Sequence, residues 1–355
     1  MKRNEKTVQG AAYDMGKKIS VIIPCYCAAK WLGKCCASLA DQTIGMKEME
    51  LIFVDDASDD GGETWNTLLA FEKQYPDSVI VIKSPVNKRQ GGARNLAMPY
   101  ASGEYLSFLD ADDWLEPFAY EKLYAYAKRT DAEIVQFEQY RYFGEHDLRP
   151  YTENEEETLV EIHTVEERAR FLTSFVMTTG FSNKFYKRDF IIASKAQFAE
   201  HVFYEEPMFT YPLMFEVERF ATLKEKLYYY RCNTSGTMMH EMNQMNTLTD
   251  HIGVQTRLFE KMSGSHYYLD YKDEIELYFM HAFLYETLMF MKSRNFPGAY
   301  PIFQRLGKMI REHYPKLWEN KYLQAAGCEK QRGLLELAMK NAGEEEFSSF
   351  YERLS

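Results

Sequence analysis

Short apolar runs alternate with helical patterns through the first 140 residues of the chain. Strands connected by helices of this length imply right-handed βαβ crossovers, and these build a mostly parallel sheet flanked by helices. The predicted strands are residues 19–24, 51–54, 79–83, 105–109 and 134–140. The predicted helices are residues 29–40, 63–74, 91–101 and 120–129. We therefore expect an α/β fold.

The fourth predicted strand runs directly into three carboxylates, Asp110, Asp112 and Asp113. Ligands of open α/β sheets bind at the carboxyl ends of the strands. Mg²⁺ is usually held there by one or two carboxylates together with substrate phosphates. This strand end therefore indicates Mg²⁺ or Mn²⁺ and a nucleotide diphosphate.

The second predicted strand also ends in acids, in the segment 55–62 with sequence Asp-Asp-Ala-Ser-Asp-Asp-Gly-Gly. Alone, this segment fits a turn with a helix N-cap. Two acidic strand ends in one βαβ array favour a nucleotide site instead. Residues 87–95 add cations and Gly91-Gly92 at a helix start, where anions bind well. They match neither the P-loop nor the Gly-x-Gly-x-x-Gly fingerprint.

Taken together, four motifs resemble those of family 2 glycosyltransferases. They are Ile19-Ser20-Val21-Ile22-Ile23-Pro24-Cys25-Tyr26, Val54-Asp55-Asp56-Ala57-Ser58-Asp59-Asp60-Gly61, Gly91-Gly92-Ala93-Arg94-Asn95, and Gly103-Glu104-Tyr105 leading into Asp110-Ala111-Asp112-Asp113. The resemblance is close over 19–130 and weaker to about residue 240. Cys27 departs from the Asn that the family often has there. The resemblance implies the GT-A fold and an inverting, metal-dependent enzyme that uses a nucleotide sugar.

Carried over by position, the resemblance implies roles for individual residues. Asp56 would accept the N3–H of a uracil-type base, and Asp112 would bind the metal. Asp110 would lie near both the ribose and the metal, and Arg94 near the donor phosphate or sugar. Asp113 would either support the residues that contact the ligand or, as we prefer, cap a helix. The remaining residues expected to bind the donor here are Pro24, Tyr26 and Ser58.

The second half holds a weaker set of motifs. Glu205-Glu206 resembles the family's Glu-Asp pair, which supplies the catalytic base, and we assign the base to Glu206. The alternative is that both are surface acids in a loop. Arg231 and Ser235 resemble a segment that closes over the diphosphate. His240 is either a further metal ligand or, as is commoner for a lone histidine, an ordinary surface or core residue.

The chain organises into a polar extension (1–18), a glycosyltransferase domain (19–240) and a helical region (245–355). Within the domain we expect a nucleotide-binding half (19–140) and an acceptor half (165–240). The C-terminal helices either form a plain helical core or shape the acceptor side or an oligomer interface, which leaves a homo-oligomer open.

Composition restricts the partners. The net charge of −11 argues against a general electrostatic grip on nucleic acid or anionic lipid. No stretch predicts a transmembrane helix or a secretory signal. The six cysteines then fit reduced thiols in a cytoplasmic protein, and peripheral contact with the inner membrane face remains open.

The expected function is transfer of a sugar, with inversion, from a nucleotide diphosphate, most simply UDP. The acceptor would be a hydroxyl of a saccharide or lipid-linked molecule in cell-surface glycan synthesis. A nucleotide-sugar binder that has lost its base remains the alternative. A nucleotidyltransferase would need a basic, glycine-rich loop after the first strand, and Cys25-Tyr26-Cys27-Ala28-Ala29 is not one.

Overall fold

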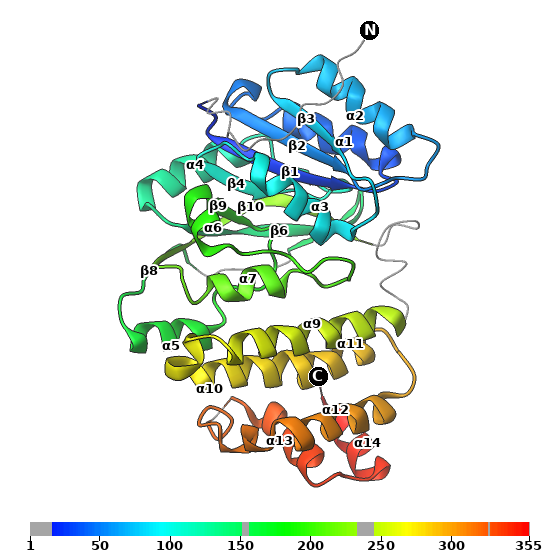
Figure 1. The fold of residues 1–355 in the computed structure, drawn as a ribbon, viewed down its shortest axis with the longest axis vertical. Coiled ribbons are helices and arrows are strands. Elements are labelled where there is room, and N and C mark those ends of the chain that lie inside the picture. The colour runs from blue at the N-terminus through cyan, green and yellow to red at the C-terminus, as the bar shows by residue number, and fades with distance from the viewer. Residues whose placement is uncertain (1–15, 151–155, 233–244, 326, 355) are drawn as a thin grey trace. The chain divides into compact units, whose positions relative to one another are not determined.

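The computed structural model describes residues 16–150, 156–232, 245–325 and 327–354 (Figure 1). The chain divides into two compact units. The sheet unit contains Met1–Ile162 and Met177–Thr234, and the helical unit contains His163–Val176 and Ser235–Ser355. The segment between Ile162 and Met177 therefore belongs with the C-terminal helices, although the chain returns to the sheet unit after it.

The sheet unit is built on one mixed sheet with the strand order β3-β2-β1-β4-β9-β6-β10-β5, while β7 pairs with β6 and β8 with β10. The strands are β1 (Ile19–Cys25), β2 (Met49–Asp55), β3 (Val79–Lys83), β4 (Tyr105–Phe108), β5 (Trp114–Leu115), β6 (Ile134–Gly144), β7 (Asp147–Pro150), β8 (Thr158–Glu161), β9 (Lys184–Lys187) and β10 (Arg219–Arg231). The first four strands are parallel, as predicted, and β9 enters antiparallel between β4 and β6. The predicted α/β fold is confirmed.

Helices cover the buried strands of this sheet, as Figure 1 shows. They are α1 (Ala29–Ala40), α2 (Glu63–Gln74), α3 (Arg89–Ala97), α4 (Ala119–Thr130), α6 (Arg188–Ser194) and α7 (Pro207–Leu213), with 3₁₀ turns η1 (Met46–Glu48) and η2 (Met98–Tyr100). Every residue of β1, β2 and β4 is buried. Continuous burial is typical of parallel strands with both faces covered, and it explains why their sequences are mostly apolar.

The register brings the ends of three strands to the same edge of the sheet. Cys25 of β1 lies opposite Asp55 of β2, and Ile22 lies opposite Phe108 of β4. The pairing continues just beyond the strands, where the N–H of Asp56 donates to the carbonyl of Cys25 at 2.8 Å. The residues that follow β2 and β4 thus lie at the same edge of the sheet, on either side of β1, because the strands are parallel.

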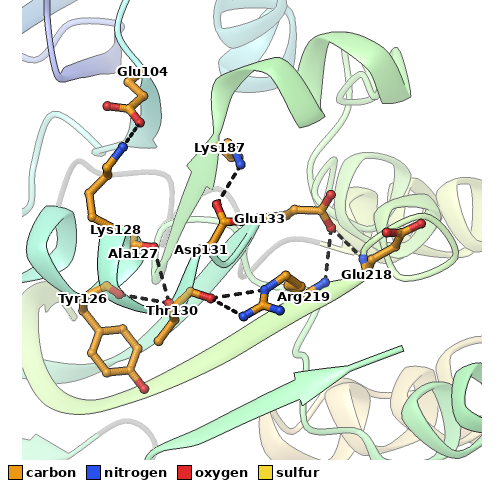
Figure 2. A network of polar contacts seen from close by, with 10 residues as sticks. All are labelled: Glu104, Tyr126, Ala127, Lys128, Thr130, Asp131, Glu133, Lys187, Glu218 and Arg219. Atoms are coloured by element: carbon orange, nitrogen blue, oxygen red, sulfur yellow. Dashed lines mark hydrogen bonds and ion pairs between the residues drawn. The ribbon is translucent and has the colours of Figure 1, made fainter. Parts of the chain in front are cut away.

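Strand β10 is anchored at its start to the turn between α4 and β6 (Figure 2). The Arg219 guanidinium donates to the carbonyl of Thr130 at 2.7 and 3.2 Å, and Glu133 accepts the backbone N–H of Glu218 at 2.6 Å. Nearby, exposed pairs such as Lys187–Asp131 add little, because water screens them. The anchored β10 runs parallel to β6 and ends at Arg231, opposite Tyr142.

The helical unit consists of helices and helical turns among its described residues. They are α5 (Val165–Ser174), α9 (Met245–Ser263), α10 (Tyr267–Phe279), the π-helical turn η3 (Met280–Glu286), α11 (Thr287–Ser293), α12 (Ala299–His313), the 3₁₀ turn η4 (Pro315–Glu319), α13 (Glu329–Met339) and α14 (Glu344–Arg353). Stacked rings such as Phe259 and Phe279, 4.2 Å apart between centroids, fill its core. Within the ranges described above, no helix combines the length and apolar character needed to span a bilayer.

Candidate functional site

The acids predicted from the sequence do gather at one edge of the sheet. Asp56 follows β2, and Asp110 and Asp112 follow β4, the strand that pairs with β1 beside β2. Asp56 is 2% exposed and accepts the backbone N–H of Lys88 at 2.9 and 3.1 Å. Burial raises the pKa of this carboxyl, while the Lys88 hydrogen bonds partly oppose the rise. The Asp56 carboxylate is therefore fixed in place by the loop that precedes α3.

The loops after β1 and β2 are tied to each other beside Asp56. Ser58 Oγ accepts the backbone N–H of Cys27 at 2.9 Å, and the Tyr26 hydroxyl donates to Asp59 Oδ1 at 3.3 Å. The Tyr26 side chain remains 47% exposed, whereas Pro24 is buried within β1. Of these two residues, only Tyr26 has a ring surface that a ligand could contact.

Arg94 on α3 joins the acidic strand end to the second half of the sheet unit. Its Nη2 donates to Asp110 Oδ1 at 2.6 Å, and its Nη1 donates to Glu205 Oε1. The side chain is 1% exposed, and its guanidinium lies 3.8 Å from the Phe181 ring centroid. Both ends of Arg94 are thus engaged by protein carboxylates. The expected contact of Arg94 with a donor phosphate stays a prediction.

The close approach of α3 to the Glu205 segment depends on a glycine. A Cβ on Gly91 would lie 2.1 Å from the carbonyl oxygen of Ala199 and 2.9 Å from Cγ of Glu205. Gln90 adds a hydrogen bond from Nε2 to Glu205 Oε2 at 2.9 Å. From the sequence, Gly91-Gly92 was interpreted only as part of an anion-binding helix start, and its contact with the Glu205 segment could not be read from the motif.

Glu205 and Glu206 occupy different surroundings. Glu205 is 2% exposed and bound to Arg94 and Gln90, while Glu206 is partly exposed at the residue before α7. Burial, and then the charge of Glu205, raises the pKa of Glu206 to about 8. A carboxyl with a raised pKa is the more basic of its kind once deprotonated. Of the pair, Glu206 is the more exposed.

The acids after β4 also divide into structural and available groups. Asp113 is buried, and it accepts the Tyr228 hydroxyl at 2.6 Å and the N–H of Arg231 at 2.7 Å. Asp112 is partly exposed, and burial together with the charge of Asp110 raises its pKa to about 6. Asp113 therefore acts as a hydrogen-bond anchor for β10, which the expectation of a helix cap missed.

Asp110 and Asp112 fit a divalent cation that is also bound by phosphate. Crowded carboxylates destabilise each other's charged form, and a cation relieves that repulsion. No group of three or more metal-binding side chains occurs among the described residues, so two carboxylates would leave positions for phosphate oxygens and water. Hard oxygen ligands of this kind suit Mg²⁺ or Mn²⁺.

Arg231 stands beside this edge at the end of β10. Its Nε donates to the carbonyl of Asp112 at 2.7 Å, and its guanidinium lies 4.8 Å from the Trp114 ring centroid. The loop after β4 and the end of β10 are therefore held together. Ser235 and His240 lie outside the described residues.

Comparisons with known proteins agree with this fold. Residues 20–193 match the family model "Glycosyl transferase family 2". A poly(ribitol-phosphate) beta-glucosyltransferase of Bacillus spizizenii is 36% identical over 119 residues, which are 33% of this chain and 18% of that protein. The poly(ribitol-phosphate) beta-N-acetylglucosaminyltransferase TarP of Staphylococcus aureus is 35% identical over 122 residues, 34% of this chain and 36% of TarP. The aligned regions thus span well under two thirds of both relatives.

Among solved structures, S. aureus TarS 1–349 in complex with UDP superposes with a TM-score of 0.69 at 20% sequence identity. The superposition covers 94% of this chain and 90% of that one. Likeness at this level of identity establishes the fold. Through residues 20–193 the chain belongs to glycosyl transferase family 2, and its fold is the GT-A fold.

Proposed function

We propose that this family 2 glycosyltransferase moves a hexose or N-acetylhexosamine from a UDP-linked donor to a hydroxyl of a saccharide or lipid-linked acceptor, with inversion, in cell-surface glycan synthesis. The observation that carries the proposal is the common edge formed by Asp56, Asp110 and Asp112 at the ends of parallel strands. The names of the curated relatives, which act on poly(ribitol-phosphate), support this class of reaction.

The donor would lie along this edge. Tyr26 offers an exposed ring to the base, with Pro24 beneath the loop and Ser58 beside it. Asp56 is the acceptor for the base N3–H, held by the two hydrogen bonds from Lys88. Arg231 presents its guanidinium beside Asp112, where it can pair with a phosphate oxygen. Ser235 follows it in the chain.

Asp112 and Asp110 would hold Mg²⁺ or Mn²⁺, which when bound neutralises charge developing on the leaving diphosphate. Arg94 acts indirectly in this proposal, by positioning two carboxylates. It orients Asp110 at one end and Glu205 at the other, so the metal-binding edge and the base segment move as one body.

Glu206 is the proposed base. It removes the proton from the acceptor hydroxyl as the oxygen attacks the anomeric carbon on the face opposite the diphosphate. Glu205 positions Glu206 and, through its negative charge, helps to keep the pKa of Glu206 high. Glu206 has one methylene more than the family's Asp, and it precedes α7, whose first residue is Pro207.

A transfer assay tests the proposal. UDP-glucose and UDP-N-acetylglucosamine are incubated with the protein and Mn²⁺, and release of UDP is followed with and without saccharide acceptors. Mn²⁺-dependent UDP release that chelator removes is the expected result. Absence of Mn²⁺-dependent binding of any UDP-sugar contradicts the proposal.

A nucleotide-sugar binder without catalytic activity is the second candidate. The raised pKa of Glu206 favours it, since most of this carboxyl is protonated at neutral pH and only the ionised fraction can accept a proton. Donor binding without turnover at pH 9, where Glu206 would be ionised, would support this candidate over the enzyme.

A further inference from the structure

A group of cations and aromatic rings lies next to Asp112 in the sheet unit. This cation–aromatic cluster consists of Lys30, Trp31, Lys34, Trp114, Tyr142 and Arg231. Three of these residues come from the first half of α1, and the others come from β5, β6 and β10. The hydrogen bond from Arg231 Nε to the Asp112 carbonyl, 2.7 Å long, connects the cluster to the proposed metal-binding loop.

Two like charges share the same two rings in this cluster. Lys34 Nζ lies 3.5 Å from the ring centroid of Trp114 and 5.2 Å from that of Tyr142. Arg231 Cζ lies 4.8 and 5.5 Å from these same centroids. Burial, and then the charge of Arg231, lowers the pKa of Lys34. The two cations therefore repel each other in the protein without ligand.

Lys30 is the third cation of the cluster, and it shares the Trp31 ring with Arg231. Lys30 Nζ lies 4.3 Å from the Trp31 ring centroid, and Arg231 Cζ lies 4.7 Å from it. Lys30 and Lys34 are exposed. No described carboxylate forms an ion pair with either lysine or with Arg231, and Glu145 acts on Lys34 only at longer range.

Several other lysines of the sheet unit have acidic partners. Lys88 pairs with Glu200 at 3.2 Å, and Lys128 pairs with Glu104 at 2.7 Å. The chain as a whole carries an excess of acid, with 53 Asp and Glu against 42 Lys and Arg. Each exposed cation–π contact contributes only about 0.5–1 kcal/mol, and mutual repulsion opposes it. Folding alone gives little reason to place Lys30 and Lys34, which have no acidic partner within 4 Å among the described residues, beside the charge of Arg231.

We propose that the cation–aromatic cluster binds the acceptor, and that the acceptor is a saccharide or polyol chain carrying phosphate groups. The partly exposed rings of Trp31 and Tyr142 suit the C–H surfaces of such a chain, and the exposed lysines Lys30 and Lys34 suit its phosphates. This inference rests on the proposed glycosyltransferase function and specifies its acceptor. Since the donor also carries phosphates, the test must separate the two sources.

The test removes positive charges from α1 and measures binding by titration calorimetry. The full chain is used, in the presence of Mn²⁺ and UDP. The double variant Lys30→Gln/Lys34→Gln is compared with Lys47→Gln/Lys73→Gln, which removes two exposed lysines from η1 and α2. The probes are a short oligo(glycerol phosphate) and an uncharged maltooligosaccharide of the same length. Both double variants change the net charge equally, so any difference between them reports the place of the charges.

The native protein should bind the phosphate-bearing probe more tightly than the uncharged one. Lys30→Gln/Lys34→Gln should weaken that binding by about fivefold, as expected for two exposed ion pairs, and flatten its salt dependence. The control pair should bind as the native protein does. Equal affinity of the native protein for the two probes, or equal binding by the two double variants, overturns the proposal.

A separate titration of UDP with Mn²⁺ distinguishes acceptor from donor. Unchanged UDP affinity in Lys30→Gln/Lys34→Gln supports the acceptor assignment, and a loss as large as that for the phosphate-bearing probe assigns the lysines to the donor and overturns it. Failure of the proposed function would show differently, as native protein that binds no UDP-sugar with Mn²⁺.

Discussion

Arg94 and Asp110 form a buried ion pair, with Nη2 of the arginine 2.6 Å from Oδ1 of the aspartate. The other end of the guanidinium meets Glu205. Arg94 therefore joins the end of β4 to the segment before α7, and its partners are a proposed metal ligand, Asp110, and the neighbour of the proposed base, Glu205.

Replacing Arg94 with methionine should destabilise the protein strongly. Removing one partner from a buried ion pair costs about 3 to 5 kcal/mol, because an uncompensated charge stays buried. Here two carboxylates, Asp110 and Glu205, would lose their cation. The free energy of unfolding, measured by urea titration, should fall by an amount in that range.

Arg129→Met is the control for this variant, since the Arg129 side chain is 70% exposed. It should change the free energy of unfolding by less than about 1 kcal/mol. Similar losses of unfolding free energy in the two variants would mean that the buried ion pairs of Arg94 do not stabilise the protein more than an exposed arginine does.

The gathering of Asp56, Asp110 and Asp112 could be predicted from the sequence because it follows from local patterns. Apolar runs and helical spacing identified β1, β2 and β4, and parallel pairing then required their carboxyl ends to share an edge. No long-range information was needed for that step, apart from the assumption that the strands belong to one sheet.

The link from Arg94 to Glu205 could not be predicted in the same way. The two residues are 111 positions apart, and no periodicity or motif in either segment indicates which residue it contacts. The antiparallel entry of β9 between β4 and β6 was hidden for a similar reason. A strand of four residues has too short a pattern to indicate its neighbours.

Asp112→Ala and Asp113→Ala should have opposite effects. Asp112 is the proposed metal ligand and crowds Asp110, so its loss should remove Mn²⁺-dependent UDP binding while leaving stability near the native value. Asp113 holds Tyr228 and Arg231, so its loss should lower the free energy of unfolding by about 1–3 kcal/mol. Calorimetry with UDP, with and without Mn²⁺, and thermal unfolding measure the two effects.

Comparison of the two variants can contradict the roles assigned to Asp112 and Asp113. Retention of Mn²⁺-dependent UDP affinity in Asp112→Ala would exclude this residue as a metal ligand. If Asp112→Ala only lowered the free energy of unfolding and Asp113→Ala left it unchanged, the structural role would belong to Asp112 and not to Asp113.

The transfer rate should rise with pH toward about 8, the pKa to which burial and Glu205 raise Glu206. A base works when deprotonated, so kcat should increase about tenfold per pH unit well below this pKa and level off above it. Glu206→Gln should keep donor affinity and lose transfer at every pH. A flat profile across this range, or an active Glu206→Gln, would place the base elsewhere.

The same ionisation has a consequence for stability. The pKa of Glu206 is higher in the folded than in the unfolded protein, so the folded state binds the extra proton between the ordinary pKa of 4.5 and about 8. The contribution is therefore present at low pH and is lost as pH rises through this window. Glu206→Gln should show a smaller fall in thermal stability from pH 5 to pH 8 than the native protein does. An equal fall in both proteins would contradict the raised pKa.

Gly91→Ala should damage the site, whereas Gly33→Ala should not. A Cβ at position 91 meets the Ala199 carbonyl at 2.1 Å and Glu205 Cγ at 2.9 Å, so the Glu205 segment must move away from α3. Gly33 is an exposed position within α1, and nothing lies within 4 Å of its added Cβ. There alanine should stabilise the helix by about 0.5–1 kcal/mol. Thermal unfolding and kcat measured together should show both values falling in Gly91→Ala, and Tm rising with kcat unchanged in Gly33→Ala. Native kcat in Gly91→Ala would mean that the contact between α3 and Glu205 does not position the base.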